Sequence, residues 1–213
     1  MKRKELLIGM VVFLAVTGWA ACNSRPDKLP VLGERTLTTD PTTGKTDTVY
    51  PSIPSFHLTD QDSTPVTGES FSGKVYISDF IFLSCPTICP KMTKEMLKVY
   101  HAFENDDRVS LLSHTIDPEY DTIPRLKQFA TSIGVRTAKW HFVTAPADTI
   151  YKLAAAYYAT AYPDSTAEGG FTHSGGLLLV DEHKHIRGVY DGTDSLETKR
   201  LIKDISQLLT ESR

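Results

Sequence analysis

Val75-Tyr76-Ile77-Ser78-Asp79-Phe80-Ile81-Phe82-Leu83 runs directly into Ser84-Cys85-Pro86-Thr87-Ile88-Cys89-Pro90, and this stretch decides the fold. The apolar run has the length of a buried β-strand. The polar, Met-containing residues 91–96 that follow predict a helix, so the two cysteines belong to a tight loop between a strand and a helix. Unpaired N–H groups and the positive end of a helix dipole favour thiolate over thiol. Thiolate is the reactive and metal-binding form of cysteine.

The spacing of four between Cys85 and Cys89 places two side chains on one face of a helical turn. Such a pair can close a reversible disulfide or hold one soft metal ion. The chain has three cysteines, and the third, Cys22, is assigned to a lipid below. Two remaining thiols are too few for a structural disulfide framework. A single stabilising disulfide is the plain alternative, but so short a loop constrains the unfolded chain little.

The N-terminal residues predict that the protein is located in the cell envelope. Lys2-Arg3-Lys4 precedes the apolar residues 6–21, which are shorter than the roughly 20 apolar residues of a membrane span and typical of a signal peptide. Ala20-Ala21-Cys22 is similar to a bacterial lipobox, with Trp19 where Leu is usual. We therefore expect a lipoprotein signal peptide at residues 1–21, lipidation of Cys22, and a membrane-anchored domain outside the cytoplasm. An uncleaved N-terminal anchor is the alternative.

The net charge of the whole chain is −3. Removal of Lys2, Arg3, Lys4 and Glu5 takes away a charge of +2 and leaves −5. This mild acidity argues against nucleic acid as a partner.

The rest of the chain divides into a tether and one domain. Residues 22–50 are poor in large apolar side chains and predict an extended tether, whereas residues 51–213 suffice for a single domain. Strands are expected at 56–58, 75–83, 109–116, 140–143, 176–180 and 185–190, and helices at 89–103, 123–133, 148–158 and 195–209. This alternation predicts an α/β, three-layer domain with a central mixed sheet. A cysteine pair at a strand-to-helix turn makes the thioredoxin-like fold the natural choice.

Several segments together carry a family resemblance. Residues 79–92 look like the CxxxCP motif of the Sco/SenC family, and Ile116-Asp117-Pro118-Glu119 resembles its Asp-Pro-Glu segment. Trp140-His141-Phe142-Val143-Thr144 resembles its Trp-containing strand. Phe171-Thr172-His173-Ser174 falls where that family carries its metal-binding histidine, although Thr172 stands where the family often has Asp. The resemblance covers residues 50–213.

The resemblance implies a membrane-tethered copper protein that helps build the dinuclear copper centre of cytochrome c oxidase. Its copper ligands would be Cys85, Cys89 and His173, with one Cu(I) or Cu(II) per chain, and Cys85 and Cys89 would also form a redox pair. Its partner would be the copper-centre subunit of the oxidase. The chemistry agrees, because two thiolates and one imidazole are a soft donor set, whereas structural zinc normally takes four protein ligands.

Other classes remain open. An extracytoplasmic thiol-disulfide oxidoreductase without a copper role would use the same cysteines, but thioredoxin types have a spacing of three and a Pro where this chain has Phe171-Thr172-His173. A peroxiredoxin would share Cys85-Pro86-Thr87 but needs Thr at the place of Phe82. Met92 and Met96 have soft thioethers, although helix core packing explains them more simply. We interpret Asp117 and Glu119 as turn residues, and His183 and His185 as exposed turn residues.

Overall fold

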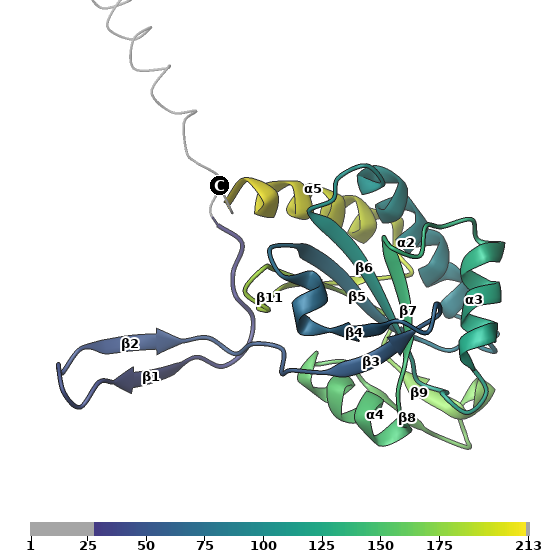
Figure 1. Cartoon of the computed structure of the whole chain (residues 1–213), viewed down its shortest axis with the longest axis horizontal. Coiled ribbons are helices and arrows are strands. Elements are labelled where there is room, and N and C mark those ends of the chain that lie inside the picture. The colour runs from purple at the N-terminus through teal and green to yellow at the C-terminus, as the bar shows by residue number, and fades with distance from the viewer. Residues whose placement is uncertain (1–27, 212–213) are drawn as a thin grey trace, which may run out of the picture.

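The computed structural model describes residues 28–211 and confirms the thioredoxin-like α/β class (Figure 1). The predicted signal peptide and Cys22 lie outside the described residues. One mixed sheet has the order β11-β10-β5-β6-β7-β3-β4. Its strands are β3 (His57–Asp60), β4 (Pro65–Thr67), β5 (Val75–Ile81), β6 (Val109–Thr115), β7 (Trp140–Thr144), β10 (Gly176–Val180) and β11 (Ile186–Asp191).

The centre of the sheet is parallel because helices connect its strands. β5 pairs with β6 and β6 with β7 in parallel, and every residue of β5 and β6 is buried. Strands covered on both faces read as continuous apolar runs rather than alternating ones, as residues 75–81 do. β11 at one edge alternates buried and less buried positions and pairs with β10 in the predicted hairpin.

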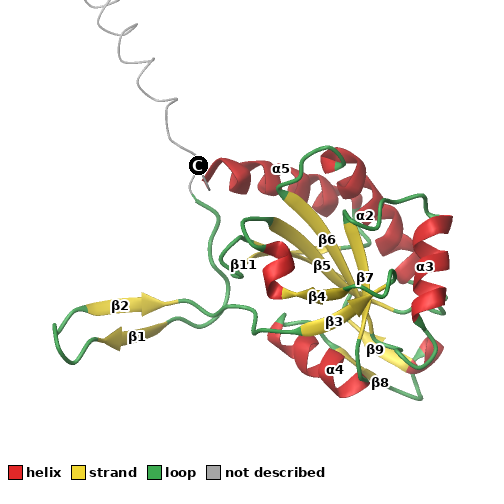
Figure 2. Ribbon diagram, in the orientation of Figure 1, coloured by secondary structure: helices red, strands yellow, loops and turns green. Residues whose placement is uncertain are grey.

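Helices form the other two layers (Figure 2). The helices are α2 (Cys89–Phe103), α3 (Ile123–Ser132), α4 (Ala147–Ala156) and α5 (Ser195–Glu211), with short 3-10 turns η1 (Gly68–Phe71) and η2 (Glu168–Gly170). Ring contacts of Tyr100 with Trp140 and of Phe129 with Phe142 place α2 and α3 on one face, and α5 packs against α2. Contacts of Tyr157 with Phe80 and His114 place the end of α4 on the opposite face.

Part of the predicted tether forms regular secondary structure, which the amino-acid composition of this segment did not indicate. β1 (Thr36–Thr39) and β2 (Thr46–Val49) form an exposed hairpin that projects from the domain (Figure 1). Before it, Arg187 of β11 donates hydrogen bonds to the carbonyls of Leu29 and Pro30 and pairs with Asp181 and Glu211. The chain is thus bound to the sheet edge before the hairpin begins.

A second pair of strands was also not predicted. β8 (Ala161–Pro163) and β9 (Phe171–His173) form a separate two-stranded sheet, with Ala161 opposite His173. Three-residue strands carry too little periodicity to be recognised from sequence. This small sheet matters for function because its last residue is the predicted histidine ligand.

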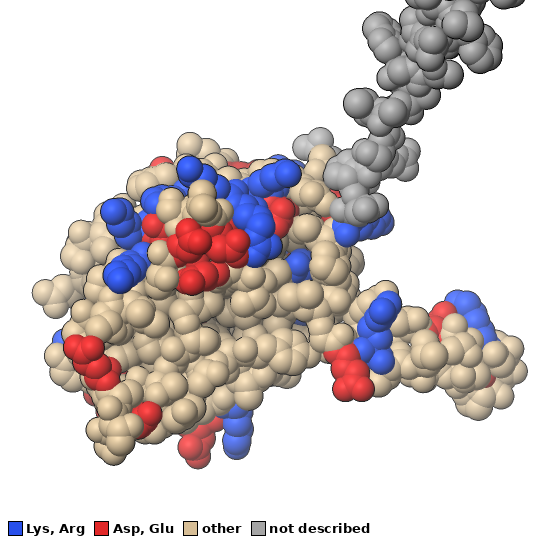
Figure 3. Space-filling view, turned by 180° about the vertical axis from the view of Figure 1, so that it is seen from behind, with Lys and Arg blue, Asp and Glu red and all other residues tan. Residues whose placement is uncertain are grey.

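Charged side chains of both signs gather on the upper part of the face in Figure 3, where basic groups surround an acidic cluster. In the layer of α2 and α5, Lys98 pairs with Glu95 and Arg200 with Glu197. Among residues 28–211, none of the helices is long and apolar enough to span a membrane.

Two ionisable groups are buried on neighbouring strands of the sheet, with their side chains on opposite faces. Burial raises the pKa of Asp79 on β5 to about 7, although the Ser113 hydroxyl opposes the change. Burial also lowers the pKa of His114 on β6 to about 4, although the Asp79 carbonyl opposes it. Both groups therefore favour the neutral form, and one atom of each, Asp79 Oδ1 and His114 Nε2, has no hydrogen-bond partner among the described residues.

These two groups should affect stability in opposite directions. The folded-state pKa of His114 lies below the unfolded value of about 6.5. Its contribution to the unfolding free energy is therefore lost as pH falls from about 6.5 to 4. The folded-state pKa of Asp79 lies above its unfolded value, so its contribution grows as pH falls from about 7 to 3.8. We expect Asp79→Asn to leave only the His114 effect, and to lose up to about 3 kcal/mol relative to wild type between pH 6.5 and 4.

Urea unfolding at pH 7, 5.5 and 4.5 checks this expectation. The double variant Asp79→Asn/His114→Gln is the control and should show no such extra acid sensitivity. If the unfolding free energy of Asp79→Asn depends on pH in the same way as that of the wild type, Asp79 does not offset the acid sensitivity caused by His114.

Candidate metal centre

The two cysteines lie where the strand-to-helix turn was predicted, but only one belongs to the helix. Cys89 is the first residue of α2, with Pro90 next to it, whereas Cys85 lies in the preceding loop. Ile88, the residue before the helix, offers no capping side chain. The sulfur of Cys85 instead accepts a hydrogen bond from the Cys89 N–H, at 3.5 Å. The loop therefore folds back so that Cys85 occupies the helix N-terminus.

His173 reaches the cysteines from the separate β8–β9 sheet. Ser174 N–H donates to the Thr160 carbonyl, and Ser174 Oγ accepts from Thr160 N–H, which fixes the chain beside the histidine. The Phe82 ring packs edge-on against the imidazole, with centroids 5.3 Å apart. Thr172 does not orient the ring, because its hydroxyl donates to Asp164. Nδ1 of His173 is buried without a hydrogen-bond partner among the described residues.

The three side chains present their donor atoms to one point. Nε2 of His173 lies 3.8 Å from Cys85 Sγ and 3.7 Å from Cys89 Sγ, and all three donor atoms lie within 4.8 Å of one another. Metal–sulfur and metal–nitrogen bonds of about 2.3 and 2.0 Å, set 120° apart, would hold sulfur and nitrogen about 3.7 Å apart. The donor set therefore fits a soft ion with three ligands and no fourth protein ligand. Within residues 28–211 it is the only cluster of this kind.

The two thiols differ in acidity although they are neighbours. Burial alone would raise the pKa of Cys85, but hydrogen bonds from the backbone N–H groups of Cys89 and Thr87 outweigh it and lower the pKa below its ordinary value. Burial raises the pKa of Cys89 well above its ordinary range, and the charge of Cys85 adds to this. Burial also lowers the pKa of His173, which keeps the imidazole neutral and able to coordinate. Cys85 is therefore the more readily ionised thiol.

Asp121 holds the metal-site loop in place, a role that its sequence context did not indicate. Its Oδ2 accepts from the Leu83 N–H at 3.0 Å and from the Thr115 hydroxyl at 2.7 Å. The side chain is fully buried, so these two hydrogen bonds do not compete with water, and burial raises the pKa of the Asp121 carboxyl. Asp117 serves the turn itself, since its carbonyl accepts from the N–H groups of Tyr120 and Asp121.

The remaining candidates lie outside the cluster. Met92 and Met96 are fully buried in the core under α2, in keeping with the packing interpretation. His183 is exposed at the hairpin turn near Glu182, as predicted. The prediction for His185 is wrong, because its side chain is half-buried near Asp181 and its ring contacts Tyr50. Neither these residues nor Asp117 and Glu119 join the three-ligand cluster.

Gly169 positions the aromatic wall of the site, which sequence reasoning missed. It has φ +85°, and a Cβ there would lie 2.9 Å from Cε2 of Phe82, the ring that packs on His173. The neighbouring Gly170 has φ +84°, but its Cβ would meet nothing within 4 Å. Alanine thus strains both backbones equally, while only Gly169→Ala displaces Phe82.

We expect Gly169→Ala to lower Cu(II) affinity about 10- to 100-fold, the usual effect of disturbing a group that orients a ligand, because Cu(II) binding depends on the His173 imidazole. Gly170→Ala should leave affinity nearly unchanged, with a smaller loss of unfolding free energy than Gly169→Ala, because only the latter variant also crowds the buried Phe82 ring. Titration of each variant with Cu(II) against a competing Cu(II) chelator, followed by visible absorption, measures the affinity. Equal affinities for the two variants would show that Phe82 does not position His173.

The comparisons with known proteins agree with this geometry. The family model SCO1/SenC matches residues 44–210. The structure of a SCO1/SenC family lipoprotein from Bacillus anthracis str. Ames is 26% identical, with a TM-score of 0.67, over 74% of this chain and 95% of that one. BsSco, described as a member of the Sco family of cytochrome c oxidase assembly proteins, is 27% identical, with a TM-score of 0.66, over 75% and 94% of the two chains.

A third structure, copper-bound ScoI from Bradyrhizobium japonicum, has a TM-score of 0.62 at 24% identity over 74% of this chain and 99% of that one, a likeness of fold. The family model spans the sheet, the cysteine loop and the histidine strand together. The chain therefore belongs to the SCO1/SenC family.

Proposed function

We propose that this protein binds one copper ion per chain through Cys85, Cys89 and His173, and serves assembly of the dinuclear copper centre of cytochrome c oxidase. In this role it delivers copper to the copper-centre subunit or reduces the cysteines of that subunit. The observation that carries the proposal is the convergence of Nε2 on both sulfurs, at 3.7 and 3.8 Å. Two thiolates and one imidazole suit copper, and Sco relatives are described as copper-bound and as oxidase assembly proteins.

The three ligands differ in charge, and together they allow the ion to be both held and released. Cys85 and Cys89 supply soft anionic donors, and His173 supplies a neutral one. A set of three protein ligands leaves a position open, so a thiolate of the partner can enter before a thiolate of this chain leaves. When no metal is held, the same cysteines, which are free in this structure, can pass two electrons to a disulfide of the partner and close their own.

Transfer to a purified partner tests the proposal. The full-length chain is mixed with the metal-free copper domain of the oxidase subunit in two experiments. In the first, the chain is loaded with copper and the cysteines of the partner are reduced; in the second, the chain is metal-free and reduced and the cysteines of the partner are oxidised. Visible absorption of the dinuclear centre should appear with the reduced partner if copper is delivered. Loss of the partner's disulfide should follow if the cysteines are reduced. If the chain purified with reductant holds no copper and neither partner form changes, the proposal is wrong.

A thiol-disulfide oxidoreductase without copper is the second candidate. It is favoured by the pair of free cysteines with unequal pKa values, one lowered and one raised. Such an enzyme would not need His173. The histidine variant described in the Discussion separates the two functions.

The site of action follows from the proposed lipid on Cys22, with the domain outside the cytoplasm; a relative is described as a lipoprotein. We expect Cys22→Ser to release the protein from the membrane or to leave its signal peptide uncleaved, because no acyl chain can then be attached. Mass spectrometry of the wild-type N-terminus checks this. A diacylglyceryl group on Cys22 supports the proposal, whereas an intact Met1 or a free Cys22 thiol means a plain hydrophobic anchor.

A further inference from the structure

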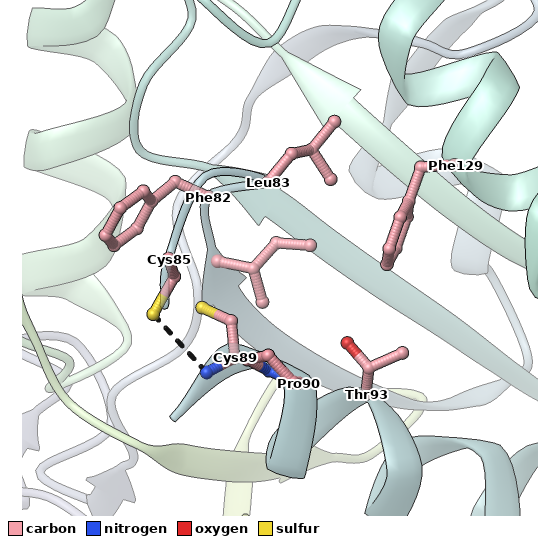
Figure 4. Close-up of a pocket in the computed structure, with 8 residues that line it drawn as sticks. Phe82, Leu83, Cys85, Cys89, Pro90, Thr93 and Phe129 are labelled. Carbon is pink, nitrogen blue, oxygen red and sulfur yellow. Dashed lines mark hydrogen bonds between the residues drawn. The ribbon is translucent and has the colours of Figure 1, made fainter. Parts of the chain in front are cut away.

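An apolar pocket adjoins the cysteines, and Cys89 forms part of its wall (Figure 4). It encloses about 270 Å³ and opens to solvent. Three parts of the fold line it: the end of β5 with the loop after it, the first turn of α2, and the middle of α3. Its lining residues include Ile81, Leu83, Cys85, Cys89, Thr93 and Phe129.

The walls of this pocket are held in place by contacts outside it. The Phe129 ring packs edge-on against Phe142 of β7, with centroids 5.4 Å apart and an angle of 87°. The backbone of Leu83 is fixed by its hydrogen bond to Asp121. The pocket is therefore preformed, and an occupant would pay little to order it.

The chemistry of the lining narrows the class of occupant. No charged side chain lines the pocket, and its polar groups are the thiols and the Thr93 hydroxyl. Its volume lies just below the range of about 300–1,000 Å³ that is typical of small-molecule sites. Space of this size and polarity suits one apolar side chain, the kind of anchor that fills a pocket at the centre of a protein interface.

We propose that this pocket receives an apolar side chain of the partner polypeptide, from a residue adjacent to the partner's own cysteine. The proposal rests on the proposed function, since a partner that exchanges copper or a disulfide must bring its cysteine to Cys85 and Cys89. Because Cys85 and Cys89 also line the pocket, the neighbouring residue of that partner arrives at the pocket mouth. His173, at the end of β9, lies beside the two sulfurs. It is not among the residues that line the pocket.

Model peptides in which cysteine carries glutathione as a mixed disulfide test the proposal. The peptides are Gly-Leu-Cys-Gly and Gly-Cys-Leu-Gly, each compared with its counterpart that has Asn in place of Leu. A thiolate of the reduced full-length chain attacks the peptide sulfur, and glutathione leaves as its thiolate. The second cysteine then closes the Cys85–Cys89 disulfide and releases the peptide thiol, so two electrons pass to the peptide disulfide.

In the wild type, at least one Leu peptide should be reduced about tenfold faster than its Asn counterpart, as expected for one apolar group in a fitting pocket. Thr93→Phe should abolish this preference by filling the pocket. Gln128→Phe, which adds the same ring at an exposed position of α3, should preserve it. Equal rates for Leu and Asn peptides in the wild type overturn the proposal, whatever the variants do.

Copper stoichiometry, measured in parallel, keeps the two proposals apart. One copper per chain with no Leu preference overturns the pocket proposal alone. A Leu preference in a chain that binds no copper supports the pocket and overturns the copper function.

Discussion

Replacing Cys85 or Cys89 with serine is expected to lower Cu(I) affinity by about a thousandfold or more. Serine keeps the size of the side chain but offers a hard, protonated oxygen in place of a soft thiolate. Structural Zn²⁺ sites release about 10–16 kcal/mol on binding. For a copper site with three donors, we expect the loss of one donor to cost at least about 4 kcal/mol, which corresponds to a thousandfold in affinity. Each variant is loaded under reducing conditions, and its affinity is measured by competition with a Cu(I) chelator.

Ser84→Ala is the matched control, because this exposed residue lies next to Cys85 but contributes no donor. It should bind like the wild type. Copper binding of wild-type strength in both cysteine variants would rule out the proposed site. A loss in only one of them would mean that the other sulfur is not a ligand.

Replacing His173 with alanine is expected to abolish Cu(II) binding while leaving most Cu(I) binding. Two thiolates can hold Cu(I) in linear coordination, whereas Cu(II) favours additional nitrogen ligands. The thiols remain, so the rate of disulfide exchange should change little. Visible absorption reports Cu(II), chelator competition reports Cu(I), and reduction of a model disulfide reports the thiols.

His101→Ala is the control for this variant, since its side chain is largely exposed on α2 and lies outside the cluster. If both oxidation states of copper bind normally to His173→Ala, the imidazole is not a ligand. In that case the oxidoreductase without a copper role becomes the better account of the cysteine pair.

The strand, loop and helix around the cysteines could be predicted because their signals are local. The apolar run 75–83, the prolines and the spacing of Met92 and Met96 lie within about one strand and one helix of each other. Their periodicity reflects which face each residue buries, and the structure has α2 at the predicted Cys89–Phe103. The hairpin β10–β11 and the helix α5 were predicted for the same reason.

The position of His173 could be inferred only from the family resemblance. The histidine is 84 residues from Cys89 along the chain. It meets the sulfurs because β9 pairs with β8, and these strands of three residues are too short to leave a periodic pattern. The roles of Gly169 and Asp121 were invisible for a related reason, because each acts on a residue of the β5–α2 loop from a separate part of the chain.

The sequence by itself therefore determined the class of chemistry, through two soft thiols at the start of a helix. It also determined the α/β architecture, through the alternation of buried strands and amphipathic helices. Only the tertiary structure decided that Cys85 lies before the helix and accepts a hydrogen bond from Cys89, and that three donors meet at one point. It also decided that an apolar pocket opens beside them. The physical reason is that local patterns report burial and backbone state, whereas distances between remote side chains depend on how the separate elements pack.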